Sequence, residues 1–188
     1  MNNLLPLTGP AEEPLTLAEA RDFLRLDSTE EDAIVAACIM AARQACESFT
    51  GRSLITQNWQ LYLDQWPTGP IALPRPPLQA VTGIKVFAAD GTETVLQTDD
   101  FWIDAAAAPG RLMARSATVL PQPGRRLGGI EITYSAGYGD SWNDVPQAIR
   151  QGLLMAVANF YENRLVETSG GLPLPIAALW QPYRVVRL

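Results

Sequence analysis

The sequence predicts an α+β fold, in which a three-helix body carries an inserted small antiparallel β unit and ends in an extended C-terminal arm. Apolar residues recur at helical spacing near both ends of the chain, whereas the period changes to two from Leu54 onward. Prolines then divide the middle of the chain into short segments. We expect the 188 residues to form one domain, with a helical body at 15–51 and 144–164, the β unit at 52–135 and the arm at 165–188.

The first two helices carry clear start signals. Thr16 and Glu19 have the spacing of a capping box, and Ser28 and Glu31 repeat it before a second helix that Gly51 ends. We expect the second helix to bury one apolar stripe widened by another: Ile34, Cys38, Ala41, Ala45 and Phe49, with Val35, Ile39, Ala42 and Cys46 beside them.

The third helix is expected to follow Asp144, which can cap it, with Pro146 in its first turn. It can pack against the first two helices only if the chain returns to them, so the β unit is an insertion. Residues 1–14 hold prolines, a glycine and two acids, and we expect them to form a loose arm.

The β unit is expected to be antiparallel. The stretch LITQNWQLYLDQW places Trp59, Leu61 and Leu63 on one side of a strand. Residues 89–92 separate GIKVF from ETVLQ as a hairpin turn would. The stretches FWIDA, GRLMA and GGIEITYSAG are predicted to be further short strands.

The composition argues against several classes of function. No histidine is present, so the usual general base and the commonest metal ligand are missing. Cys38 and Cys46 lie about 12 Å apart along one predicted helix, too far for a disulfide, and are expected to be buried free thiols. The apolar run AIVAACIMAA is too short to span a membrane, so no membrane partner is expected.

Three acids form the strongest candidate for an acid–base site, namely Asp99, Asp100 and Asp104. A solvated turn between two strands explains them more simply. The stretch GDSWND at 139–144 lacks the ligand spacing of a calcium loop, and GYG at 137–139 lacks the phosphate-loop pattern. We therefore expect no catalytic residue, no metal and no cofactor.

The charge is distributed unevenly. The net charge of −6 argues against a surface that neutralises phosphates, although an acidic wall would let DNA pass without holding it. Residues 12–47 hold nine acids against three arginines. The basic residues Arg111, Arg115, Arg125 and Arg126 show no aromatic interleaving, and we expect either solvated loop charges or contact with an acidic neighbouring subunit.

The C-terminal segment LPLPIAALWQPYRVVRL is unusually apolar for a chain end. The three- and four-residue spacing of its apolar residues makes a short helix after Pro175 possible. The segment could pack on its own domain or dock on another chain. Arg, Trp and Tyr are enriched at interface hot spots, which favours docking. The residues expected to bind a partner in this docking arm are Leu174, Ile176, Leu179, Trp180, Tyr183, Arg184 and Arg187.

The order of motifs resembles the head–tail connector (adaptor, or head completion) family of tailed phages and gene transfer agents. The second helix ends in FTGR at Phe49–Arg52, and a proline-rich β insertion follows. A Tyr-x-x-Gly-Tyr-Gly turn at Tyr134–Gly139 and Val145-Pro146 come next. The last part of the pattern is a long helix with Asn159, Tyr161 and Arg164.

The resemblance implies a structural protein of the virion or gene transfer agent neck, made in the cytoplasm of a bacterial host. Its members form a ring, usually of twelve copies, on the portal protein. The ring extends the DNA channel without sequence-specific binding and receives the next tail-side connector or stopper protein. The C-terminal segment commonly docks on the portal, here residues 172–188. No catalytic residue carries over from the family.

Two other functions remain open from the residues themselves. The first is an intracellular enzyme that uses the carboxylates of the β unit. The second is a stand-alone dimeric binding module whose C-terminal segment packs on its own core.

Overall fold

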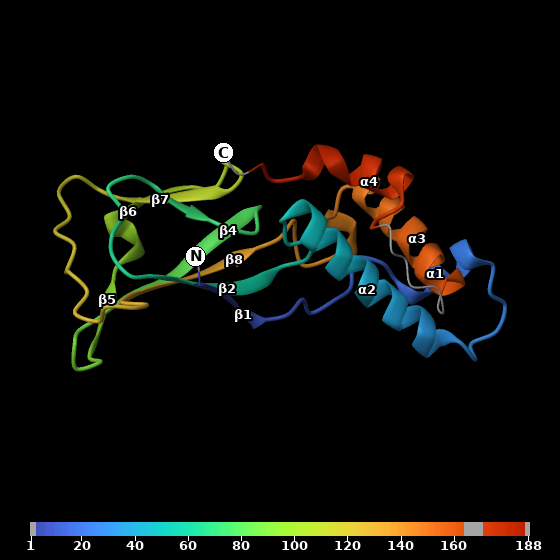
Figure 1. The fold of residues 1–188 in the computed structure, drawn as a ribbon, viewed down its shortest axis with the longest axis horizontal. Helices are drawn as coiled ribbons and strands as arrows, with labels where there is room; N and C mark the ends of the chain where they lie inside the picture. The colour runs from blue at the N-terminus through green and yellow to red at the C-terminus, as the bar shows by residue number, and fades with distance from the viewer. Residues whose placement is uncertain (1–2, 164–170, 187–188) are drawn as a thin grey trace. The chain divides into compact units, whose positions relative to one another are not determined.

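The computed structural model describes residues 3–163 and 171–186 and divides into two compact units. The first comprises Met1–Gly9 and Thr56–Gly137 and is called the β unit; the second comprises Pro10–Ile55 and Tyr138–Leu188 and is called the helical unit. All described strands belong to the β unit and all described α-helices to the helical unit (Figure 1). The expected α+β class with antiparallel sheets is confirmed.

The helical unit contains four described α-helices rather than three. They are α1 (Leu17–Leu24), α2 (Asp32–Thr50), α3 (Gln147–Glu162) and α4 (Leu174–Trp180). The predicted capping box of α1 is present: Thr16 Oγ1 accepts from the Glu19 N–H at 3.1 Å, and Glu19 accepts from the Thr16 N–H at 3.0 Å. No described helix is both long and apolar enough to cross a membrane.

Two predicted helix starts are wrong by a few residues. Helix α2 begins at Asp32, because Ser28 Oγ accepts from the Glu30 N–H within a turn instead of capping a helix. Asp144 does not cap α3 but accepts from the Ser141 N–H at 3.0 Å, which closes a short 3₁₀ turn. Helix α3 then begins only after Pro146.

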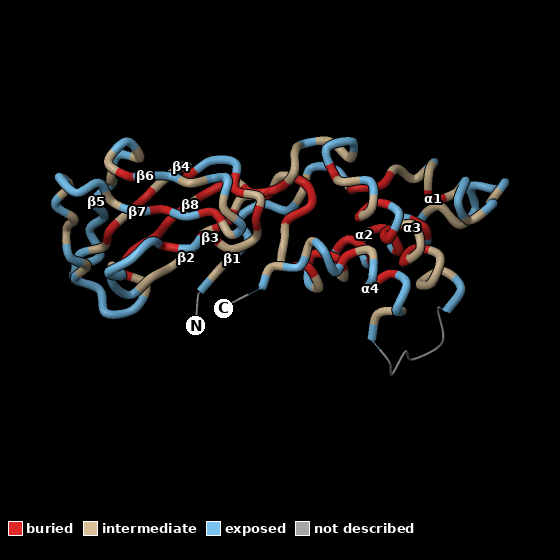
Figure 2. The backbone as a smooth tube through the Cα atoms, turned by 90° about the horizontal axis from the view of Figure 1, so that it is seen from above, coloured by how far each residue is buried: buried red, intermediate tan, exposed pale blue. Residues whose placement is uncertain are grey.

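The buried face of α2 is the second of the two predicted stripes. Val35, Ile39 and Ala42 are buried, whereas Ile34, expected on the main stripe, is 39% exposed. The contacts with α1 and α3 set this rotation, which the sequence pattern alone does not fix. Cys38 and Cys46 are buried free thiols, as expected. Figure 2 shows the buried segments of α2 and α3.

The β unit consists of two antiparallel sheets. The five-stranded sheet has the order β1-β2-β8-β4-β5, and the three-stranded sheet has the order β3-β7-β6. Apolar side chains from both sheets form one core. The strands are β1 (Asn3–Thr8), β2 (Gln57–Leu63), β3 (Ile71–Leu73), β4 (Leu78–Phe87), β5 (Glu93–Leu96), β6 (Phe101–Asp104), β7 (Gly110–Ala114) and β8 (Ile130–Ala136).

The expectation of a loose N-terminal arm is wrong for residues 3–8. They form strand β1, which pairs antiparallel with β2 at the edge of the five-stranded sheet. Pro6 is tolerated there because an edge strand has one side that needs no ladder hydrogen bond. The predicted hairpin is confirmed: the Ala88 N–H donates to the Thr92 carbonyl at 2.9 Å between β4 and β5.

Candidate functional site

The C-terminal segment contains a short helix, which the spacing of its apolar residues had indicated as possible, and is not extended throughout. Helix α4 begins after Pro173, and Pro175 lies in its first turn, where a missing N–H costs no helical hydrogen bond. A 3₁₀ turn at Gln181–Tyr183 follows. The described part of the segment therefore has a fixed shape of its own.

Trp180 attaches α4 to the helical unit. Its side chain is fully buried, and its indole N–H donates to the Ile149 carbonyl of α3 at 3.2 Å. The ring lies over Gly152, where an added Cβ would come within 2.3 Å of the indole nitrogen. Ile176 is buried in the same core. Two of the residues expected to bind a partner are thus core residues of the single chain.

The end of the segment is tied to the C-terminus of α2. The Arg52 Nε–H donates to the Tyr183 carbonyl at 2.5 Å, and the Val185 N–H donates to the Thr50 carbonyl at 2.8 Å. The Arg184 guanidinium lies 5.5 Å from the centre of the Phe49 ring. These contacts hold the backbone in place up to residue 185.

The remaining predicted partner-binding residues differ in exposure. Leu174 is 85% exposed, Arg184 is also exposed, and Leu179 and Tyr183 are half-buried. Arg187 lies outside the described residues. Val186, which sequence reasoning did not select, is 73% exposed. Leu174 and Val186 are therefore the exposed large hydrophobic side chains of the described part of this segment.

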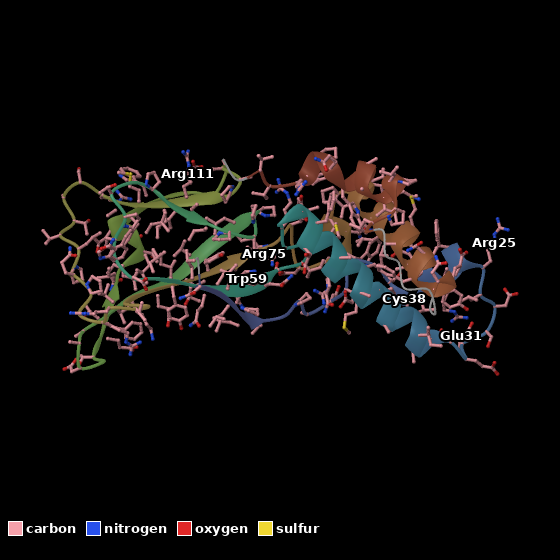
Figure 3. The ribbon with its side chains drawn as sticks, viewed as in Figure 1. Arg25, Glu31, Cys38, Trp59, Arg75 and Arg111 are labelled. Carbon is pink, nitrogen blue, oxygen red and sulfur yellow. The ribbon has the colours of Figure 1, made fainter. Side chains whose placement is uncertain are left out.

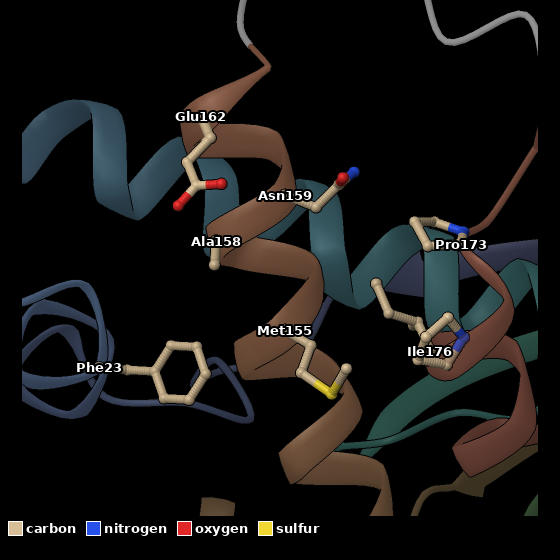
Figure 4. Close-up of a pocket in the computed structure, with 8 residues that line it drawn as sticks. Phe23, Met155, Ala158, Asn159, Glu162, Pro173 and Ile176 are labelled. Carbon is tan, nitrogen blue, oxygen red and sulfur yellow. The ribbon is translucent and has the colours of Figure 1, made fainter.

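A shallow groove of about 310 Å³ runs beside α4 (Figure 4). Phe23 of α1, Met155 of α3 and Ile176 of α4 give it apolar walls, and Asn159 and Glu162 add polar groups. These residue types suit contact with a side chain more than chemistry, because the lining holds one carboxylate and no nucleophile paired with a base.

Of the three candidate carboxylates of the β unit, Asp104 is held by an arginine. Asp104 forms an ion pair with Arg111 at 2.5 Å across β6 and β7, and this hydrogen bond lowers the pKa of Asp104. Asp99 and Asp100 lie in a 3₁₀ turn before β6. Within residues 3–163 and 171–186, no group of three His, Cys, Asp or Glu residues could hold a metal ion.

Two arginines of the β unit have aromatic neighbours in space, although no aromatic residues are interleaved with them in the sequence. The Arg115 guanidinium lies 4.1 Å from the centre of the Trp102 ring, and the Arg125 guanidinium lies 4.7 Å from that of Phe87. Arg111 points away from β7 (Figure 3). Sequence reasoning missed Trp102, although the alternation in FWID could have placed it opposite Phe101 on an outward face.

The comparisons with known proteins cover nearly the whole chain. The head completion protein family matches residues 13–172. A chain from the neck of an empty gene transfer agent particle, with C6 symmetry, is 31% identical, with a TM-score of 0.84, and the match covers 98% of this chain and 96% of that chain. No curated protein matches.

Two further solved structures agree. A chain in the virion of a native gene transfer agent particle is 28% identical, with a TM-score of 0.80, over 99% of this chain and 97% of that one. A chain from the neck of a native gene transfer agent particle with C12 symmetry is 30% identical, with a TM-score of 0.79, and the match covers 98% of this chain and 96% of that chain. The resemblance expected from the sequence is confirmed, and the chain belongs to the head completion protein family.

Proposed function

We propose that this chain is the head–tail adaptor in the neck of a gene transfer agent or a related tailed phage particle. One observation carries the proposal: the match to a neck chain extends over 98% of the sequence, so that both units are included. The family assignment supports the same structural role independently. The role requires no catalytic residue, metal or cofactor.

The adaptor acts as a ring of twelve copies on the portal protein. The C6 and C12 symmetries of the similar necks support a cyclic assembly. A ring extends the channel through which DNA leaves the head, and a net charge of −6 keeps the wall from holding phosphates tightly. The opposite side of the ring receives the next tail-side connector or stopper protein.

The docking surface for the portal is centred on the exposed side chains of the C-terminal segment. Leu174 and Val186 offer apolar area, and Arg184 offers a cation. Ile176 and Trp180 support this surface from the core and position it. Leu179 and Tyr183 flank it, and Arg187 extends it beyond the described residues.

The experiment that tests portal docking uses surface substitutions, because removing residues 172–188 would also remove Trp180 from the core. The variant Leu174→Asp with Val186→Asp places two carboxylates on the proposed surface and leaves the core intact. We expect it to lose at least tenfold in affinity for the portal protein of the same particle, measured by pull-down and light scattering of the complex.

The matched control is Leu127→Asp, since Leu127 is a 75% exposed leucine of the β unit. We expect the control to bind the portal as the unaltered chain does. Equal binding by the unaltered chain, the double variant and the control would show that the C-terminal segment does not dock on the portal. A folded chain that never enters portal-containing particles would contradict the adaptor function itself.

A further inference from the structure

The outward face of the three-stranded sheet carries exposed residues that have no part in the proposed portal docking. Strand alternation sends Phe101 and Leu112 into the core and turns Trp102 and Met113 outward. Trp102 and Met113 are cross-strand partners, 61% and 48% exposed. We call the outward residues Trp102, Asp104, Arg111, Met113 and Arg115 the β6–β7 face.

Trp102 is held in place although it is exposed. The guanidinium of Arg115 stacks on one side of its ring, and Met113 lies opposite it on β7. Such a stack orients the aromatic ring before any partner arrives, so little side-chain freedom is lost on binding. Trp, Met and Arg are the residue types enriched at the centres of protein interfaces.

The charges of this face indicate which kind of partner surface is complementary to it. Arg111 is neutralised by Asp104. Among residues 3–163 and 171–186, no ion pair involves Arg115. The face therefore offers an apolar centre beside one cation that forms no ion pair with the described residues. Its complement is an exposed apolar side chain that has carboxylates next to it.

The α1–α2 end of the helical unit has this complementary chemistry. Phe23 and Ile34 are 42% and 39% exposed there. The acids Asp22, Asp27 and Glu30 lie between or beside them and are exposed, and the ion pairs of the described residues include none of the three. Along the chain these three acids flank the two apolar residues and outnumber Arg25, the one exposed cation among residues 22–34.

We propose that the β6–β7 face of one copy docks on the α1–α2 end of the next copy. The contact joins two different surfaces, which is what a head-to-tail interface requires and what a cyclic ring repeats at every subunit. This inference rests on the proposed ring and adds the residues that close it. Trp102 is the anchor, and Arg115 meets the acids of the neighbouring copy.

The test is photo-crosslinking of the full chain inside assembled particles, with p-benzoyl-phenylalanine in place of Trp102. Irradiation followed by mass spectrometry should join position 102 to residues 22–34 of a second copy. The same probe in place of Val95, which is 58% exposed in the other sheet, is the control and should not reach that segment. Crosslinks from position 102 to the portal, to a tail protein or only within one chain would overturn the inference.

A second variant measures the same contact without a probe. Trp102→Ala should lower the fraction of the chain found in rings at least tenfold, whereas Val95→Ala should change it less than twofold. Rings of Trp102→Ala that form as well as the unaltered ones would overturn the inference and leave the adaptor function standing. The absence of the unaltered chain from the necks of assembled particles would contradict both the adaptor function and this inference.

Discussion

Trp180 and Trp102 lie in different units and in opposite environments. Trp180 is fully buried, donates its indole N–H to Ile149 and covers Gly152. Trp102 is 61% exposed on a sheet face and stacks on Arg115. The C-terminal segment looked like the binding element in the sequence, yet its largest side chain holds the fold, while the β unit exposes a tryptophan.

The difference shows that an apolar, aromatic segment is not by itself an interface. An aromatic side chain that closes its own core is not available to a partner unless that core opens. An aromatic side chain that stays half in water and is oriented by a neighbour can be buried by a partner at little cost. Substitutions at Trp180, Gly152 and Trp102 test this difference, and a substitution at Glu19 adds a pH-dependent measurement of the same helical unit.

The largest effect is expected for Trp180→Ala. The substitution leaves a cavity over α3 and removes the hydrogen bond to the Ile149 carbonyl, so the free energy of unfolding should fall by about 3–5 kcal/mol. Urea denaturation followed by circular dichroism measures it. A loss under about 1 kcal/mol would mean that α4 is not part of the core.

Gly152→Ala tests the same contact between Trp180 and α3 by changing the residue on α3. The added methyl would come within 2.3 Å of the indole nitrogen, so α4 or α3 must shift. The better helix propensity of alanine offsets part of this cost. We expect a net destabilisation of about 1–2 kcal/mol, and the control Gly69→Ala, in open space, should be close to neutral. The denaturant midpoints of Gly152→Ala and Gly69→Ala measure these two effects, and equal midpoints would contradict the close contact between Gly152 and Trp180.

A smaller effect, dependent on pH, is expected at Glu19. Partial burial raises the pKa of Glu19, but hydrogen bonds from Thr16 and Arg150 outweigh it and hold the pKa below its ordinary value. Since the folded pKa is the lower one, this stability is present above the unfolded pKa of about 4.3 and is lost as the pH falls through the folded value.

The matched variant for that prediction is Glu19→Gln, which keeps the size and removes the titration. The difference in denaturant midpoint between the two proteins should be largest above pH 5 and shrink toward pH 3. A difference that does not change with pH over this range would show that ionisation of Glu19 adds no stability.

The smallest effect on stability is expected for Trp102→Ala. The exposed stack with Arg115 contributes about 0.5–1 kcal/mol, and little apolar area leaves the core. Thermal denaturation should therefore place this variant near the unaltered chain while ring formation falls. A destabilisation as large as that of Trp180→Ala would mean that Trp102, like Trp180, stabilises the core of its unit.

Much of the fold could be predicted from local chemistry. The capping box at Thr16 and Glu19, the glycine end of α2 at Gly51 and the hairpin before Thr92 depend on residues close in sequence. Such features survive in the folded chain because no distant contact competes with them. The order of motifs was enough to indicate the family.

The errors arose where distant segments decide the outcome. The rotation of α2 depends on α1 and α3, and strand β1 exists because β2 offers it an edge. The burial of Trp180 depends on Gly152, a glycine on another helix that the sequence does not connect with it. The exposure of Trp102 depends on which side of its sheet faces the core.

The most direct test of the adaptor assignment is a cryo-electron microscopy reconstruction of the neck of particles that encode this chain. We predict a closed ring of copies of this fold between the portal and the tail, with the β6–β7 face of each copy against the α1–α2 end of the next. Particles that have both head and tail but whose neck contains no copy of this chain would contradict it.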